Sequence, residues 1–179
     1  MRVIAGTARG RKLISPEGQN VRPTLDRVKE SVFNMLTGFI QNANVLDLFA
    51  GSGALGIEAL SRGAANAVFV DKSASSLEIV QKNLILTHFE EKAKLVCNDF
   101  LAYLDHATEK FDIIFLDPPY AADFLDSALN AIQTQKLLAP NGLIVCELDS
   151  AEKVICPKNY ELYRNKKYGK ARILLMKEL

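Results

Sequence analysis

The stretch VLDLFAGSGALG, residues 45–56, decides the fold of this chain. An apolar run interrupted by one aspartate is followed by glycines at positions 51, 53 and 56, in the spacing Gly-x-Gly-x-x-Gly. This order predicts a buried strand, a tight turn and a helix, as in dinucleotide-binding turns. Asp71 follows Gly51 by twenty residues, at the end of the next apolar run. Folds with this turn place an acid there to bind ribose hydroxyls.

Short apolar runs alternate with helical patterns after this turn. The runs are residues 45–49, 67–70, 93–96, 111–116 and 142–148, and helices are expected at about 53–62, 75–86, 99–106 and 123–137. Continuously apolar strands separated by helices predict an α/β fold with a mostly parallel sheet. Ser75 and Glu78 form a candidate capping box for the second of these helices. The last stretch, 160–179, has no helical pattern and predicts an antiparallel hairpin at the sheet edge, which brings the sheet to seven strands.

The 179 residues predict a single domain. A short β-hairpin is expected within a basic N-terminal arm, residues 1–23, followed by a helix at 24–40 with Thr24 as candidate N-cap and a core at 44–179. Three widely spaced cysteines and two histidines suggest neither a disulfide framework nor a metal site. No apolar run is long enough to span a membrane and no secretory pattern opens the sequence, so a soluble, cytoplasmic protein is expected.

Charge is unevenly distributed along the chain. Residues 1–29 hold seven basic and two acidic side chains, whereas the remainder holds fifteen basic and nineteen acidic ones. A second basic cluster lies near the other end, at Lys158, Arg164, Lys166, Lys167, Lys170 and Arg172. This pattern is compatible with a polyanionic partner and equally with a solvated basic surface.

The aspartate within the opening stretch changes what the glycine turn is expected to bind. Asp47 lies four residues before the first glycine, where its carboxylate would repel a pyrophosphate and attract an ammonium group. S-adenosylmethionine has an amine, a ribose and an adenine but no phosphate, and Asp71 can accept its ribose hydroxyls. Asp99 is a candidate for the adenine amino group, with Phe100 beside the ring, or equally a helix N-cap. The predicted cofactor contacts are Asp47, Phe49, Gly51, Gly53, Asp71, Lys72, Asp99 and Phe100.

A second motif, FLDPPY at residues 115–120, ends the fourth apolar run. In a doubly wound sheet this strand lies beside the first, at the switch point where ligands bind. Two prolines remove two N–H donors, so the backbone there offers only carbonyl acceptors. Asp117 and the Pro118 carbonyl suit an exocyclic amine, and Tyr120 a stacked base. The predicted catalytic residues are Asp117, Pro118, Pro119 and Tyr120; the alternative is a loop start with Tyr120 in the core.

Three further segments carry a family resemblance. RVIAGTARGRKL (2–13), RPTLDRVKESVFNML (22–36) and DLFAGSGALGIEALSRGA (47–64), followed by DPPY, resemble the RsmD family of bacterial 16S rRNA guanine-N2 methyltransferases. The resemblance covers nearly the whole chain. It implies a Rossmann-like class I methyltransferase with S-adenosylmethionine as cofactor. It also implies methyl transfer to N2 of one guanine in 16S rRNA, within a small-subunit particle, by a protein expected to be monomeric.

The arm then has a candidate role as an RNA contact. Arg9, Arg11, Lys12, Arg22 and Arg27 are the predicted phosphate contacts, although Arg22-Pro23-Thr24 is equally a candidate lid over the cofactor. Other amino targets, adenine N6 in RNA or DNA or a protein glutamine, are the alternative substrates. An NAD-dependent oxidoreductase and a non-catalytic RNA-binding module are the alternatives from other classes.

Overall fold

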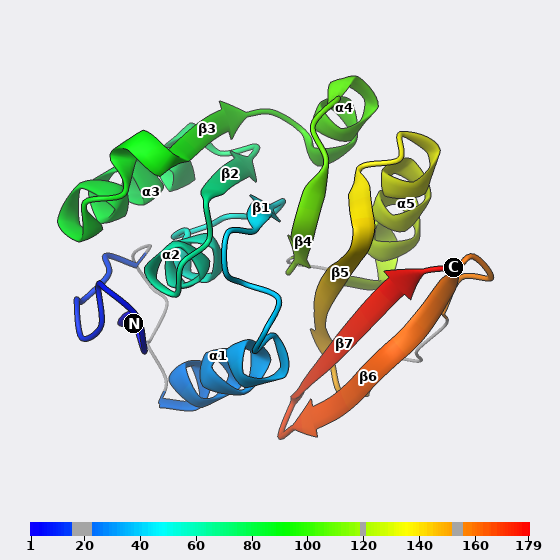
Figure 1. The fold of residues 1–179 in the computed structure, drawn as a ribbon, viewed down its shortest axis with the longest axis horizontal. Helices are drawn as coiled ribbons and strands as arrows, with labels where there is room; N and C mark the ends of the chain where they lie inside the picture. The colour runs from blue at the N-terminus through cyan, green and yellow to red at the C-terminus, as the bar shows by residue number, and fades with distance from the viewer. Residues whose placement is uncertain (16–22, 119–120, 152–155) are drawn as a thin grey trace.

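A computed structural model describes residues 1–15, 23–118, 121–151 and 156–179, without the side chains of 23–25 and 121–123. One seven-stranded sheet in the order β3-β2-β1-β4-β5-β7-β6 runs through the molecule (Figure 1). The strands are β1 Asn44–Asp47, β2 Asn66–Asp71, β3 Ala93–Cys97, β4 Phe111–Leu116, β5 Leu138–Asp149, β6 Tyr160–Tyr168 and β7 Ala171–Glu178. The first five are parallel, and β7 pairs antiparallel with both β5 and β6. The predicted α/β sheet with an antiparallel C-terminal hairpin is confirmed.

Helices cover both faces of the sheet. They are α1 Pro23–Met35, α2 Ala54–Ser61, α3 Ala74–Thr87, α4 Phe100–His106 and α5 Ala121–Thr134, with a 3-10 turn at Glu90–Lys92. One apolar core places α1, α2 and α3 against one face, and a second core places α4 and α5 against the other (Figure 1). Alternate residues of each strand enter alternate cores, because successive side chains of a strand point to opposite faces.

Several helix ends differ from the sequence expectations. Helix α1 begins at Pro23, so Thr24 lies inside it and is not its N-cap, and α5 ends at Thr134. The helix expected at 24–40 ends at Met35, since the chain tightens into a turn in which Phe39 N–H donates to the Leu36 carbonyl and Gly38 has a φ of 91°. The capping box expected of Ser75 and Glu78 is wrong. Ser73 is the N-cap of α3, and its hydroxyl accepts the N–H of Ser76.

The N-terminal segment forms a very short hairpin with one antiparallel bridge, between Arg2 and Lys12. It is held to α2 by hydrogen bonds from the backbone N–H groups of Ile4 and Ala5 to the Glu58 carboxylate. Gly6 has a φ of 85°, and a Cβ there would lie 1.8 Å from the Ser61 carbonyl oxygen. Only glycine allows the arm to approach α2 this closely.

The topology fixes where a ligand can bind. Strands β2 and β3 extend from β1 in one direction, while β4 and β5 extend in the other, so the order reverses between β1 and β4. Open α/β sheets bind ligands at this point, outside the carboxyl ends of the strands. The dinucleotide-binding Rossmann order ends 4-5-6, whereas this sheet inserts antiparallel β7 between β5 and β6. Within the described ranges, no helix is long and apolar enough to cross a membrane.

Candidate active site

A cavity of about 470 Å³ opens at the carboxyl ends of β1, β2 and β4. Most of the predicted cofactor and catalytic residues line it, namely Asp47, Phe49, Gly51, Asp71, Lys72, Asp99, Phe100, Asp117 and Pro118. Gly53 lies outside the lining. Pro119 and Tyr120 fall outside the described residues. The two motifs that the sequence separates by about sixty positions therefore border one pocket.

Each glycine of the turn is required for a different structural reason. Gly51 has a φ of 54° and no protein atom within 4 Å of the position a Cβ would take. Gly53 precedes α2 with a φ of 76°, and a Cβ there would meet Val80 at 3.0 Å. A Cβ at Gly56 would overlap the Phe69 ring at 2.3 Å, so this glycine allows α2 to pack on β2. Gly51 alone leaves an open face toward the pocket.

Asp71 braces the turn. One of its carboxylate oxygens accepts the Gly51 N–H at 2.9 Å, and the other accepts the Ser73 N–H at 2.8 Å. Each carboxylate oxygen can accept a second hydrogen bond. Asp71 is therefore able to bind two hydroxyl groups of a ligand while it holds the loops after β1 and β2 in place.

Asp47 is a buried acid at the end of β1. Its Oδ2 accepts the Gly56 N–H at 3.0 Å, and among the described residues this is its one hydrogen-bond donor. The balance of burial, the opposing hydrogen bond from the Gly56 N–H, and repulsion from Asp117 and Asp71 raises the pKa of Asp47 to about 7, with burial as the largest cause. A cation in the pocket would favour the ionised form.

Aromatic rings form another wall of the cavity. Phe49 and Phe100 have ring centroids 5.2 Å apart, and Phe124 of α5 lies 5.4 Å from Phe100. Asp99 is the N-cap of α4, and its Oδ1 accepts the N–H groups of Leu101 and Ala102. The predicted alternative of a helix cap is thus confirmed for Asp99, which still borders the cavity. This wall offers an apolar surface against which a planar ring can pack.

Asp117 stands at the switch point, directly after β4. Asp117 is exposed to the cavity, which it lines. The rest of the residue is surrounded by protein atoms and is shielded from bulk solvent. This burial raises the pKa of Asp117 to about 6. Pro118 is buried beside it and contributes no N–H donor. The Asp117 carboxylate and the Pro118 carbonyl both offer acceptors.

The cavity lining is acidic. It carries five carboxyl groups, from Asp47, Asp71, Asp99, Asp117 and Glu147, against the two lysine side chains of Lys29 and Lys72. Lys29 is neutralised locally, because its Nζ lies 3.2 Å from the buried Glu58 carboxylate. Within the described chain, no group of three histidine, cysteine or acidic side chains is arranged to hold a metal ion. The excess of carboxyl groups favours a cationic ligand.

Comparison with known proteins identifies the family. The family model described as conserved hypothetical protein 95 matches residues 1–177. Ribosomal RNA small subunit methyltransferase D of Haemophilus influenzae is 38% identical over 172 residues, covering 94% of this chain and 89% of the relative. The chain belongs to the RsmD family. The enzyme of the same name in Escherichia coli strain K12 is also 38% identical, over 170 residues that cover 94% of this chain and 85% of the relative.

The fold comparison agrees. The solved structure of yhhF from Escherichia coli superimposes with a TM-score of 0.89 and 37% identity, covering 99% of this chain and 97% of that one. Family and fold together make this chain a methyltransferase. The resemblance inferred from the sequence is confirmed.

The described members of the predicted RNA contacts, Arg9, Arg11, Lys12 and Arg27, do not line the cavity. Arg9 and Arg27 line a second hollow together with Arg2, Asp26 and Glu30, in which Arg2 pairs with Asp26 at 3.5 Å. Arg11 is exposed but donates to the Leu86 carbonyl at the end of α3, and Lys12 is exposed on the arm. Arg22 falls outside the described residues. Phosphate binding by these side chains stays a prediction.

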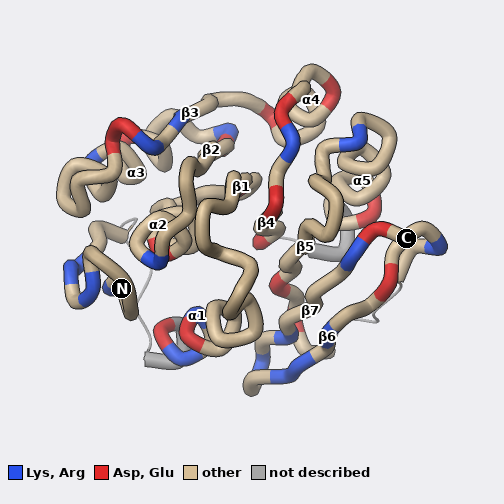
Figure 2. Tube along the Cα trace, viewed as in Figure 1, with Lys and Arg blue, Asp and Glu red and all other residues tan. Residues whose placement is uncertain are grey.

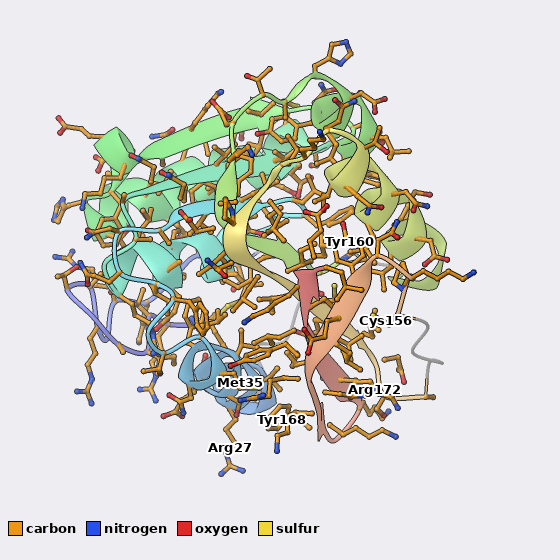
Figure 3. The ribbon with its side chains drawn as sticks, turned by 45° about the vertical axis from the view of Figure 1, so that its right-hand side comes forward. Arg27, Met35, Cys156, Tyr160, Tyr168 and Arg172 are labelled. Atoms are coloured by element: carbon orange, nitrogen blue, oxygen red, sulfur yellow. The ribbon has the colours of Figure 1, made fainter. Side chains whose placement is uncertain are left out.

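A second basic surface lies at the β6–β7 turn. The stretch from Lys166 to Arg172 contains four basic side chains, and Figure 2 shows this end of the hairpin reaching toward α1. Met35 of α1 and Tyr168 at the end of β6 pack against the same core and lie near each other in Figure 3. Arg27 points outward from α1 on this side (Figure 3). The two basic regions, distant in sequence, thus flank α1.

Sequence reasoning missed two features of the site. Glu147 of β5 lines the cavity beside Asp117, and Glu58 of α2 fixes Lys29 next to it. The only sequence signal for either was an acid within an otherwise apolar run. Such an acid needs either a partner or a ligand.

Proposed function

We propose that this enzyme transfers a methyl group from S-adenosylmethionine to the exocyclic N2 amine of a guanine in 16S ribosomal RNA. The single observation that carries the proposal is the position of Asp117 and Pro118, which offer acceptors at the switch point of an acidic cavity. The relatives named as small-subunit rRNA methyltransferases support the choice of RNA.

The lining residues fit the proposed cofactor. Asp47 lies where it can pair with an ammonium group, Asp71 can bind ribose hydroxyls, and Phe49 and Phe100 present an apolar surface for adenine. The open face of Gly51 allows a ligand to contact the turn. S-adenosylmethionine supplies a methyl group on a cationic sulfur. The acidic lining stabilises that charge.

Asp117 and Pro118 act on the amine. An exocyclic amine of a nucleobase is a weak nucleophile because its lone pair is delocalised into the ring. Hydrogen bonds from the NH2 group to the Asp117 carboxylate and the Pro118 carbonyl turn that lone pair toward the methyl group. As the N–C bond forms, the C–S bond breaks and its electron pair stays on sulfur. The amine then gives one proton to Asp117 or to water.

Other substrates are less well supported. Adenine N6 and a protein glutamine also present an NH2 group, so they remain the alternatives that the transfer assay must separate. NAD is disfavoured because five carboxyl groups line the cavity and would repel a pyrophosphate. The insertion of β7 between β5 and β6 also departs from the dinucleotide-binding order.

The proposed partner is a small-subunit particle, bound by the protein as a monomer. Support comes from the two basic regions that flank α1, whose exposed side chains suit RNA phosphates. The experiment supplies radiolabelled S-adenosylmethionine with unmodified 16S rRNA, naked or in small subunits, and digests the RNA to nucleosides. We expect label in N2-methylguanosine, at the higher rate in the particle. Label in N6-methyladenosine, or in protein alone, would overturn the assignment.

A further inference from the structure

Glu147 lies in the same row as the proposed catalytic acid. Leu116 of β4 pairs with Cys146 of β5, so the next position on each chain brings Asp117 and Glu147 side by side. Neighbouring strands are about 4.8 Å apart. The strand alternation places Glu147 on the face of Leu143 and Val145, which is the face covered by α1. Both carboxyl groups line the cavity.

Glu147 has no partner within the described part of the chain. No hydrogen-bond donor or cation lies in range of its carboxylate there, whereas Asp47, Asp71 and Asp99 each accept backbone N–H groups. Burial, and then repulsion from Asp117, raise the pKa of Glu147 to about 7. A partly buried acid without a donor costs stability unless a ligand supplies one.

The target base can supply that donor. Guanine carries its N1–H beside its N2 amine on the same edge of the ring, so this edge presents two neighbouring hydrogen-bond donors. The neighbouring carboxylates of Asp117, after β4, and Glu147, on β5, can accept one hydrogen bond each from these two donors. Adenine presents an N1 lone pair beside its amine, which an ionised carboxylate repels.

We propose that Glu147 accepts the guanine N1–H and thereby selects guanine, while Asp117 and Pro118 hold the N2 amine. The inference rests on the proposed function and extends it to base selection. Glu147 acts as a specificity residue, because it contacts the substrate edge without taking part in bond formation. A site built to pair with a donor rejects an analogue that lacks it.

The test compares guanosine with 2-aminopurine riboside at the target position. 2-Aminopurine keeps the 2-amino group but has an N1 acceptor in place of N1–H. The probe RNA is 16S rRNA ligated with either nucleotide at the position that the wild-type enzyme labels, and assembled into small subunits. Single-turnover kcat/KM is measured for the wild type, Glu147→Gln and the control Glu161→Gln, an exposed acid on β6.

The wild type should prefer guanosine by about ten- to a hundredfold, the range of one good base contact. The glutamine amide of Glu147→Gln can donate to the N1 acceptor of 2-aminopurine. The ratio of kcat/KM for guanosine to that for 2-aminopurine should therefore fall about tenfold or more in this variant, partly because transfer to 2-aminopurine becomes faster. Glu161→Gln should keep the wild-type ratio. Calorimetry with S-adenosylhomocysteine confirms that each variant is folded.

Two results would overturn the inference in distinguishable ways. If Glu147→Gln slows both substrates equally while it binds S-adenosylhomocysteine normally, Glu147 is structural and the guanine assignment stands. If the wild type transfers no methyl group to the guanosine of unmodified small subunits, the proposed function itself fails, and base selection by Glu147 fails with it.

Discussion

The fully buried Glu58 carboxylate lies 3.2 Å from the Nζ of Lys29, which is itself buried. The same carboxylate accepts the N–H groups of Ile4 and Ala5 and pairs with Arg62 at 2.8 Å. Lys29 also donates to the Arg2 carbonyl at 2.6 Å. One acid on α2 therefore joins the N-terminal arm and α1 to the core, next to the cavity at the end of β1.

Removing this acid should destabilise the protein strongly. Glu58→Ala leaves Lys29 buried without its counter-charge, and breaking a buried pair in this way costs about 3–5 kcal/mol. Urea denaturation measures the loss. The matched control is Glu109→Ala, which breaks the exposed pair with Lys94 at 2.8 Å and should cost about 1 kcal/mol or less. Equal losses in the two variants would contradict the structural role of Glu58.

Asp47 should contribute charge to cofactor binding. In Asp47→Asn the side-chain oxygen can still accept the Gly56 N–H, so the fold is kept while the negative charge is lost. We expect about tenfold or greater weakening of S-adenosylmethionine binding in calorimetry, as one charge-assisted contact is lost. Asp105→Asn, at an exposed position of α4, is the control. Unchanged affinity in Asp47→Asn would make this acid purely a structural brace.

The buried carboxyl groups should link stability to pH. The pKa of Asp47 is raised to about 7 and that of Asp117 to about 6, so the folded protein binds protons that the unfolded chain has lost. Their contribution to stability is therefore present at low pH and is lost as pH rises to about 7. The free energy of unfolding of Asp47→Asn should therefore rise relative to that of the wild type between about pH 4 and 7, with no further change above that range. Denaturant titrations across this range measure the difference, and a constant difference would refute the shift.

The arm and α1 should bind RNA through phosphate charge. Replacing Arg9 and Arg27 with glutamine should weaken binding to 16S rRNA fragments of any sequence. The slope of log affinity against log salt should fall by about 1 for each lost phosphate contact. Lys110→Gln, an exposed position before β4, is the control. A salt slope equal to the wild type's would remove these residues from the interface.

The fold followed from the sequence because its signals were local. The glycine turn at 51–56, the apolar strands and the absence of a helix in 160–179 were enough to predict a parallel sheet with an antiparallel hairpin, and each is confirmed. The helix boundaries were less predictable. Ser73 and Ser75 are equally good caps by residue type, and only the backbone around Asp71 decides between them, because Asp71 accepts the Ser73 N–H.

The site was predicted in part. Asp47 and Asp117 were found because each belongs to a motif whose place in a doubly wound sheet is known. Glu147 was missed because its position beside Asp117 depends on the register between β4 and β5, which the sequence does not reveal. Glu58 was missed for a similar reason, because its partners come from residues more than fifty positions away.

The central claim is methyl transfer to a guanine N2 amine directed by Asp117. The most direct measurement compares the wild type with Asp117→Ala on unmodified small subunits, followed by mass spectrometry of the labelled nucleosides. The wild type should place about one methyl group per particle as N2-methylguanosine, and Asp117→Ala should lose at least about a hundredfold in rate. Binding of S-adenosylhomocysteine should stay within about threefold of the wild type, because the lost contact is to the amine. Label in any other nucleoside, or full transfer by Asp117→Ala, would contradict the account.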